Sequence, residues 1–135
     1  MDYLKHKGRN FRHFISTPII YSLLIPIVIM DIWCEIYHRT CFPLYGLPYV
    51  KRKNYVLIDR HKLKYLSFRQ KLGCVYCGYA NGVVHYCSEI AAQTEKYWCG
   101  IMHQKKKGFI PPAHHAKFLR YNDKKQFEKF AGKRK

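Results

Sequence analysis

The hydrophobic and polar positions divide the chain into one long apolar run and several shorter amphipathic stretches. Phe14–Met30 holds 17 residues without a charge, and extension to Cys34 adds only Asp31. A membrane-spanning helix needs about 20 mostly apolar residues, with a range of ~17–25. The pattern therefore predicts a membrane-associated helix over residues 14–38.

Local signals give this predicted helix its details. Thr17 followed by Pro18 is typical of a helix start, because threonine caps and a proline at the first helical position loses no needed donor. Pro26 is expected to kink the helix, and Trp33 and Tyr37 fall where an aromatic interface belt would lie. The alternatives are a buried helix of a soluble protein, a re-entrant segment and a cleaved signal peptide, although no A-x-A-like cleavage site follows the run.

The distribution of charge indicates the kind of partner. The chain carries 25 Lys and Arg against 8 Asp and Glu, yet residues 14–38 hold no Lys or Arg and residues 72–103 hold only Lys96. A net charge of +17 is a property that concerns partners rather than fold. Beside a membrane segment it favours anionic lipid headgroups or an acidic protein. We expect this surface to include Lys51, Arg52, Lys53, Lys62 and Lys64.

The same basic residues predict sidedness. Residues 1–13 hold 4 of the 25 Lys and Arg, so the other 21 follow the apolar run, and the positive-inside rule places that part in the cytoplasm. A single span would leave the basic N-terminus outside, whereas a shallow monotopic insertion keeps both ends inside. Both arrangements stay open.

The stretch after the apolar run predicts a connector and a strand. Pro43, Gly46 and Pro48 prevent a continuous helix and indicate an extended connector. Tyr55–Ile58 is β-branched and aromatic in character, which favours a short strand.

Two helices are expected next. The first covers residues 60–73, with Asp59 as its cap and Gly73 as its end. Asn81-Gly82 indicates a turn, and a second helix then continues towards His103. We therefore predict a mainly α fold: a kinked N-terminal membrane helix, then a small helical Cys/His domain with at most a short strand pair. The expected order is a basic tail (1–13), the membrane helix (14–38), the connector (39–54), the Cys/His domain (55–104) and a basic tail with a short helix (105–135).

Six cysteines carry the candidate chemistry, and four residues form a metal-ligand pattern: Cys74, Cys77, Cys99 and His103. A two-residue gap lets two thiolates bind one metal, and Cys99 and His103 share one face if they lie on a helix. A Cys/His set of this kind is typical of tetrahedral structural zinc. Buried thiols in a turn and a redox-active pair are the alternatives.

Further residues extend this set. Glu95, Cys99 and His103 follow at helical spacing, so Glu95 is a candidate extra or outer ligand, and Cys41 is another if the connector folds back. We interpret Cys34 and Cys87 as packing residues, and His114-His115 as a weaker metal candidate on the surface.

Two resemblances bear on this pattern. "CVYCGY" and "YWCGIMH" resemble the two knuckles of rubredoxin, which keeps iron open as an alternative to zinc. "CFPLYG", "YVLIDRHKLKYL", "KLGCVYCGYANG" and "EIAAQTEKYWCGIMH" together resemble a family of small uncharacterised bacterial membrane-associated proteins. That resemblance implies a bacterial inner-membrane location and a membrane-linked Cys/His module.

Three functions are compatible with the sequence. The first is a membrane-anchored metal-binding adaptor or assembly protein, with zinc as the metal and lipid or an unidentified protein as the partner. The second is an iron- or CxxC-based redox protein at the membrane. Nucleic-acid binding is the weaker third, because the chain has no recognisable motif for it. No G-x-S-x-G, H-E-x-x-H or phosphate loop indicates an enzyme or a small-molecule substrate.

Overall fold

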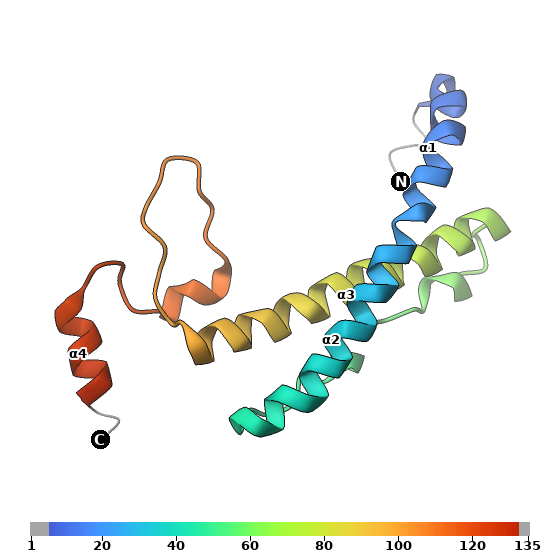
Figure 1. Cartoon of the computed structure of the whole chain (residues 1–135). Helices are drawn as coiled ribbons and strands as arrows, with labels where there is room; N and C mark the ends of the chain where they lie inside the picture. The colour runs from blue at the N-terminus through green and yellow to red at the C-terminus, as the bar shows by residue number, and fades with distance from the viewer. Residues whose placement is uncertain (1–5, 133–135) are drawn as a thin grey trace. The chain divides into compact units, whose positions relative to one another are not determined.

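The computed structural model describes residues 6–132, and these are mainly helical. Residues 1–5 and 133–135, parts of the two predicted basic tails, lie outside the described residues. The longer elements are α1 (Asn10–Ser22), α2 (Leu24–Tyr45), α3 (Phe68–Trp98) and α4 (Lys124–Gly132) (Figure 1). The chain divides into an N-terminal unit that ends at Ile90 and a C-terminal unit that begins at Ala91, so the boundary falls within α3.

The predicted fold class is confirmed, but the predicted strand is wrong. Tyr55–Ile58 is irregular, and among residues 6–132 the β-type pairing is an isolated parallel bridge between Ile101 and Leu119. Short 3-10 helices occur among the remaining residues: Lys7–Arg9, Arg52–Asn54, Arg60–Lys62 and Ala113–Lys117.

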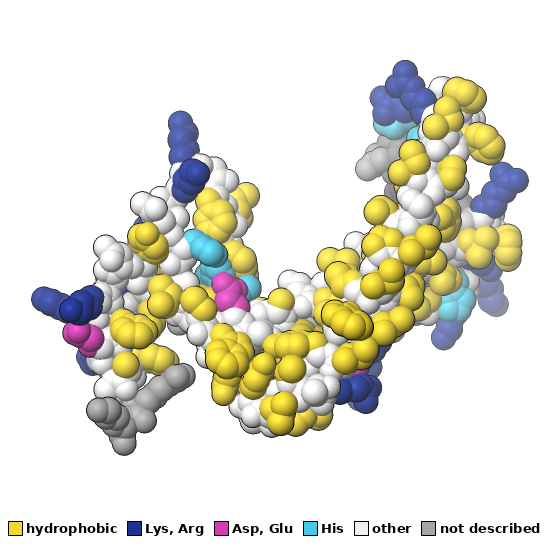
Figure 2. Space-filling model, in the orientation of Figure 1, with side chains coloured by type: hydrophobic (Ala, Val, Ile, Leu, Met, Phe, Trp, Pro, Cys, Tyr) yellow, Lys and Arg dark blue, Asp and Glu magenta, His cyan; other side chains and the backbone are white. Residues whose placement is uncertain are grey.

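The apolar run forms a long exposed helix. Asn10–Tyr45 is long and apolar enough to cross a membrane, and none of its most apolar window is buried inside the structure. The core helix of a soluble protein would bury such a window. Figure 2 shows hydrophobic side chains along α1 and α2.

The start of this helix differs from the prediction. α1 begins at Asn10, and Pro18 lies inside it, so Thr17 is not a cap. The Thr17 hydroxyl donates instead to the His13 carbonyl oxygen at 2.7 Å. The helix is interrupted at Leu23, one turn before Pro26, which has no N–H to donate to the preceding turn.

Helix α2 continues through part of the predicted connector. Pro43 lies in its last turn, and the Tyr49 hydroxyl donates to the Arg39 carbonyl oxygen at 3.4 Å, the acceptor that a residue 43 N–H would have used. The helix ends at Gly46, whose φ of 67° is left-handed. The Leu47 N–H bonds the Phe42 oxygen at 2.9 Å and the Gly46 N–H bonds the Pro43 oxygen at 3.1 Å, which is a Schellman motif.

Helix α3 is one continuous helix where we predicted two. It begins after Ser67, whose N–H bonds Gln70 Oε1 at 2.9 Å while Ser67 Oγ accepts from the Gln70 N–H at 3.5 Å, a capping box. The predicted end at Gly73 and turn at Gly82 are both wrong. A Cβ on Gly82 would lie 2.8 Å from Val56 Cα. This glycine therefore permits close packing of Tyr55 and Val56 on the helix, not a turn.

The core of the N-terminal unit joins α2, the connector and α3. Its fully buried members are Phe42 from α2 and Val83, Tyr86 and Ile90 from α3. Cys87 belongs to this core and Cys34 packs against it, which confirms the packing interpretation of these two thiols.

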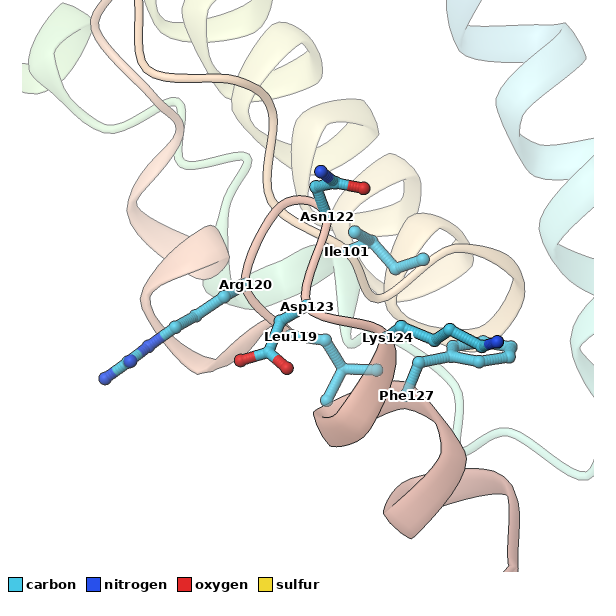
Figure 3. Close-up of a pocket in the computed structure, with 7 residues that line it drawn as sticks. All are labelled: Ile101, Leu119, Arg120, Asn122, Asp123, Lys124 and Phe127. Carbon is cyan, nitrogen blue, oxygen red and sulfur yellow. The ribbon is translucent and has the colours of Figure 1, made fainter.

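The C-terminal unit is organised around the bridge between Ile101 and Leu119. The Leu119 N–H bonds the Gly100 oxygen at 2.7 Å, and the Met102 N–H bonds the Leu119 oxygen at 2.8 Å. Asp123 then caps α4, because its Oδ1 accepts from the Gln126 N–H at 2.9 Å. Figure 3 shows the residues that line the hollow between this bridge and α4, with Arg120 pointing away.

Candidate metal centre

Three potential metal ligands converge in the C-terminal unit: Glu95, His103 and His115. One ligand atom from each lies within 4.8 Å of the others. Figure 2 shows histidine beside an acidic side chain in this part of the molecule. Two imidazoles and a carboxylate are a ligand set used by zinc and by non-haem iron, and both leave further coordination positions for water or substrate.

Each ligand is positioned by a different element. Glu95 lies in the last turn of α3, and its carbonyl oxygen accepts from the Cys99 N–H at 2.6 Å as the helix ends. His103 follows the bridge residue Ile101 by two positions. His115 lies in the 3-10 helix Ala113–Lys117, is 2% exposed, and stacks on Phe118 with ring centroids 4.8 Å apart.

Hydrogen bonds already hold the carboxylate of Glu95 against two histidines. His114 Nε2 lies 2.7 Å from Glu95 Oε2, and His115 Nε2 lies 3.1 Å from both carboxylate oxygens. The bond from His114 is the main reason why the pKa of Glu95 is lowered, against the opposing effect of burial. The carboxylate is therefore held ionised, the state in which it binds a metal.

A metal ion at this place would replace a proton. His115 Nε2 must carry a proton in order to donate to the carboxylate, and a metal needs that nitrogen deprotonated. The exchange keeps an electropositive group between the imidazole and Glu95. His114 remains on Glu95 Oε2, in the place of an outer-sphere partner that orients a ligating carboxylate.

The sequence-predicted ligands fall in both units. Cys74 and Cys77 lie within α3 in the N-terminal unit, half-buried and exposed respectively, and not in a turn. Cys99 and His103 belong to the C-terminal unit, beyond the end of α3 at Trp98. The predicted helical i, i+4 relation between them is therefore wrong.

The structure brings two of the candidates together with a third residue. His103 and Glu95 meet at His115, which the sequence interpretation placed on the surface and which is buried. No cysteine belongs to the three-ligand group found among residues 6–132. Ligation by Cys74, Cys77 and Cys99 stays a prediction, as does ligation by Cys41, which is half-buried in α2.

A second polar cluster, missed from the sequence, lies in the N-terminal unit. Arg52 Nη2 donates to Asp31 Oδ2 at 2.8 Å, and its other terminal nitrogen pairs with Oδ1. The Tyr79 hydroxyl donates to Asp31 Oδ2 at 2.8 Å. The bond to Asp31 raises the pKa of Arg52. This ion pair ties the connector to α2.

Beside the ion pair runs a directed chain of hydrogen bonds. His38 Nε2 accepts from the Val50 N–H at 3.0 Å, so the proton of the neutral ring is on Nδ1, which donates to the Tyr86 oxygen at 3.0 Å. Tyr86 in turn donates to Glu35 Oε1 at 3.1 Å. Burial raises the pKa of Tyr86, which keeps that hydroxyl protonated.

The predicted lipid surface divides into two kinds of residue. Lys51, Lys53, Lys62 and Lys64 are exposed, as a headgroup contact requires. Arg52 has an intramolecular partner in Asp31, a role that the sequence interpretation did not assign.

Comparison with known proteins gives no relative. No protein-family model, no curated protein and no solved structure matches the chain. The resemblance to small bacterial membrane-associated proteins stays a prediction.

Proposed function

We propose that this chain is a membrane-anchored metal-binding protein whose metal is held by Glu95, His103 and His115. The observation that carries the proposal is the convergence of these three side chains within 4.8 Å, with one of the imidazoles buried. Zinc suits two nitrogen ligands and one carboxylate oxygen, and its site has room for a fourth ligand.

Helices α1 and α2 supply the anchor in this proposal. Their apolar surface is exposed, and about 20 residues of such a helix match the hydrocarbon thickness of a bilayer. The polar cluster of Asp31, Arg52 and Glu35 falls after the most apolar part, where the helix would leave the hydrocarbon. A cytoplasmic, bacterial inner-membrane location follows from the basic residues and the family resemblance, and belongs to the same proposal.

The role in this proposal is that of an adaptor or assembly protein. The exposed lysines at 51, 53, 62 and 64 would hold anionic lipid headgroups or an acidic protein close to the membrane. The metal would fix the fold of the C-terminal unit, because binding energy at a structural site is folding energy.

The test is the metal content of the full chain purified in mild detergent. We expect about one zinc ion per chain, lost in His115→Ala and retained in His6→Ala, which removes an exposed histidine in the other unit. Circular dichroism checks that both variants keep their helices. Zinc retained by His115→Ala but lost in Cys77→Ser would assign the metal to the cysteines and refute this site.

The redox alternative gives a different result in the same experiment. Iron in place of zinc, with a visible thiolate charge-transfer band, would favour an electron-transfer centre built on cysteine. A chain without metal under all conditions would refute the metal-binding function and the iron centre, and would leave only metal-free redox chemistry of Cys74 and Cys77 as the alternative.

A further inference from the structure

The segment between two of the proposed ligands has an unusual surface. Residues 104–112 run from His103 towards His115 and read QKKKGFIPP; we call them the lysine loop. Every residue of this loop is exposed, and Ile110 is 88% exposed. Gly108 turns the chain with a left-handed φ of 82°, and the Phe109 N–H bonds the Lys106 oxygen at 3.1 Å. The turn therefore sets three lysines directly beside two apolar side chains.

The chemistry of the loop fits an anionic bilayer. Lysine is attracted to acidic headgroups, and an exposed isoleucine and phenylalanine gain by entering the boundary between headgroups and acyl chains. The region around the loop does not oppose this attraction, since residues 104–135 carry 11 Lys and Arg against only Asp123 and Glu128. A nucleic acid would satisfy the lysines but would leave Ile110 in water.

The loop is also coupled to the metal centre by its two ends. His103 stands immediately before it, His115 follows within three residues, and a metal bound to both would close it into a ring. The ring of His103 contacts that of Phe109 edge to face, with centroids 5.4 Å apart. A loop closed by the metal has already lost conformational freedom, so it loses less of it on docking than an open loop would. Metal and bilayer must then favour each other's binding to the same extent.

We propose that the lysine loop docks on anionic lipid and that the metal at Glu95, His103 and His115 organises it for docking. This inference rests on the proposed metal site and adds to it a lipid class and a regulation. Lysines at 105, 106 and 107 enter the headgroup region, and Phe109 and Ile110 enter the layer beneath. Removal of the metal frees the His103 end of the loop, although the bridge of Ile101 with Leu119 still holds the wider segment, and it weakens the contact of the loop with the bilayer.

Trypsin provides the test, because the loop offers it three consecutive lysines. The full chain is placed in lipid nanodiscs of phosphatidylcholine, with or without phosphatidylserine, and loaded with zinc or treated with EDTA. The rate of cleavage after Lys105–Lys107 is followed by mass spectrometry. We expect the zinc-loaded chain to be cleaved about ten-fold more slowly in the anionic discs than in the neutral ones, and EDTA to abolish most of that difference.

Two variants make the test specific. Ile110→Asp should abolish the protection by anionic lipid while the chain still binds zinc, since the side chain is almost fully exposed. Phe68→Asp is the matched control, because Phe68 is 75% exposed in the N-terminal unit and lies outside both the loop and the set of lysines assigned to headgroups. Its protection should equal that of the unaltered chain.

The outcomes distinguish failure of this inference from failure of the proposed function on which it rests. Equal cleavage in both lipids, with zinc bound, would overturn the docking and leave the metal site standing. Protection by anionic lipid that EDTA does not change would overturn the coupling between the metal and lipid docking. Protection from trypsin by added RNA in neutral discs would assign the loop to nucleic acid. A chain that binds no zinc would overturn the proposed function itself.

Discussion

Gly82 and Gly73 provide a matched pair of substitutions within one helix. Both lie in α3, at positions where the sequence suggested a helix end or a turn. A Cβ at Gly82 would lie 2.8 Å from Val56 Cα and 2.9 Å from the Tyr55 oxygen, closer than real Cβ atoms come. A Cβ at Gly73 would meet nothing within 4 Å. Alanine therefore has a different effect at each position.

The magnitudes follow from two competing terms. Alanine is favoured over glycine in a helix interior by about 1 kcal/mol, and this gain applies at both positions. Overpacking costs about 1–3 kcal/mol where the neighbours are backbone atoms that must shift, and this cost applies only at Gly82. Gly73→Ala should raise the free energy of unfolding by about 1 kcal/mol, and Gly82→Ala should lower it by ~0–2 kcal/mol.

The assay is unfolding of the full chain in mixed detergent micelles, followed by circular dichroism. Comparison of the two variants removes the helix-propensity term and leaves the cost of the contact with Tyr55 and Val56. If Gly82→Ala stabilised the chain as much as Gly73→Ala, Tyr55 and Val56 would not pack closely on α3 at Gly82, and our explanation of this glycine would be refuted.

Two further predictions concern the charged clusters. Asp31→Asn removes the bidentate partner of Arg52 and leaves it only the longer pair with Glu35, so it should lower the free energy of unfolding by about 2 kcal/mol. Asp59→Asn at an exposed position should change the free energy of unfolding little. The same unfolding assay decides, and equal effects would refute a role for the ion pair. The lowered pKa of Glu95 means that its ionised carboxylate stabilises the metal-free C-terminal unit. This stabilisation is complete above the ordinary pKa of 4.5 and is lost as the pH falls through the lowered pKa. Unfolding measured from pH 6 to pH 3 should show this loss in the unaltered chain but not in Glu95→Gln, and identical curves would contradict it.

The helical class and the apolar segment were predictable because they depend on local pattern. A run of 17 uncharged residues can form only a few kinds of structure. Ser67 with Gln70 is a helix-capping signal that can be recognised in the sequence, and our prediction overlooked it. Gly82 led to the wrong prediction of a turn. A glycine that allows close packing and a glycine that makes a turn cannot be distinguished until the packing neighbour is known.

The candidate site was only partly predictable because its members are separated along the chain. Glu95 and His103 stood out by spacing, but His115 joins them through the bridge of Ile101 with Leu119, which no local pattern indicates. The pairing of Asp31 with Arg52 spans 21 positions and joins a helix to a connector. Both depend on tertiary packing, which decides which polar side chains meet.

The central claim is that the metal is bound by nitrogen and oxygen and not by sulfur. X-ray absorption of the zinc-loaded full chain measures this directly, because zinc–nitrogen and zinc–oxygen bonds are about 2.0–2.1 Å and zinc–sulfur bonds about 2.3 Å. Ligation by Glu95, His103 and His115 predicts a first shell of light atoms near the shorter distance, with imidazole scattering beyond it. A shell dominated by sulfur would contradict the account and return the metal to Cys74, Cys77 and Cys99.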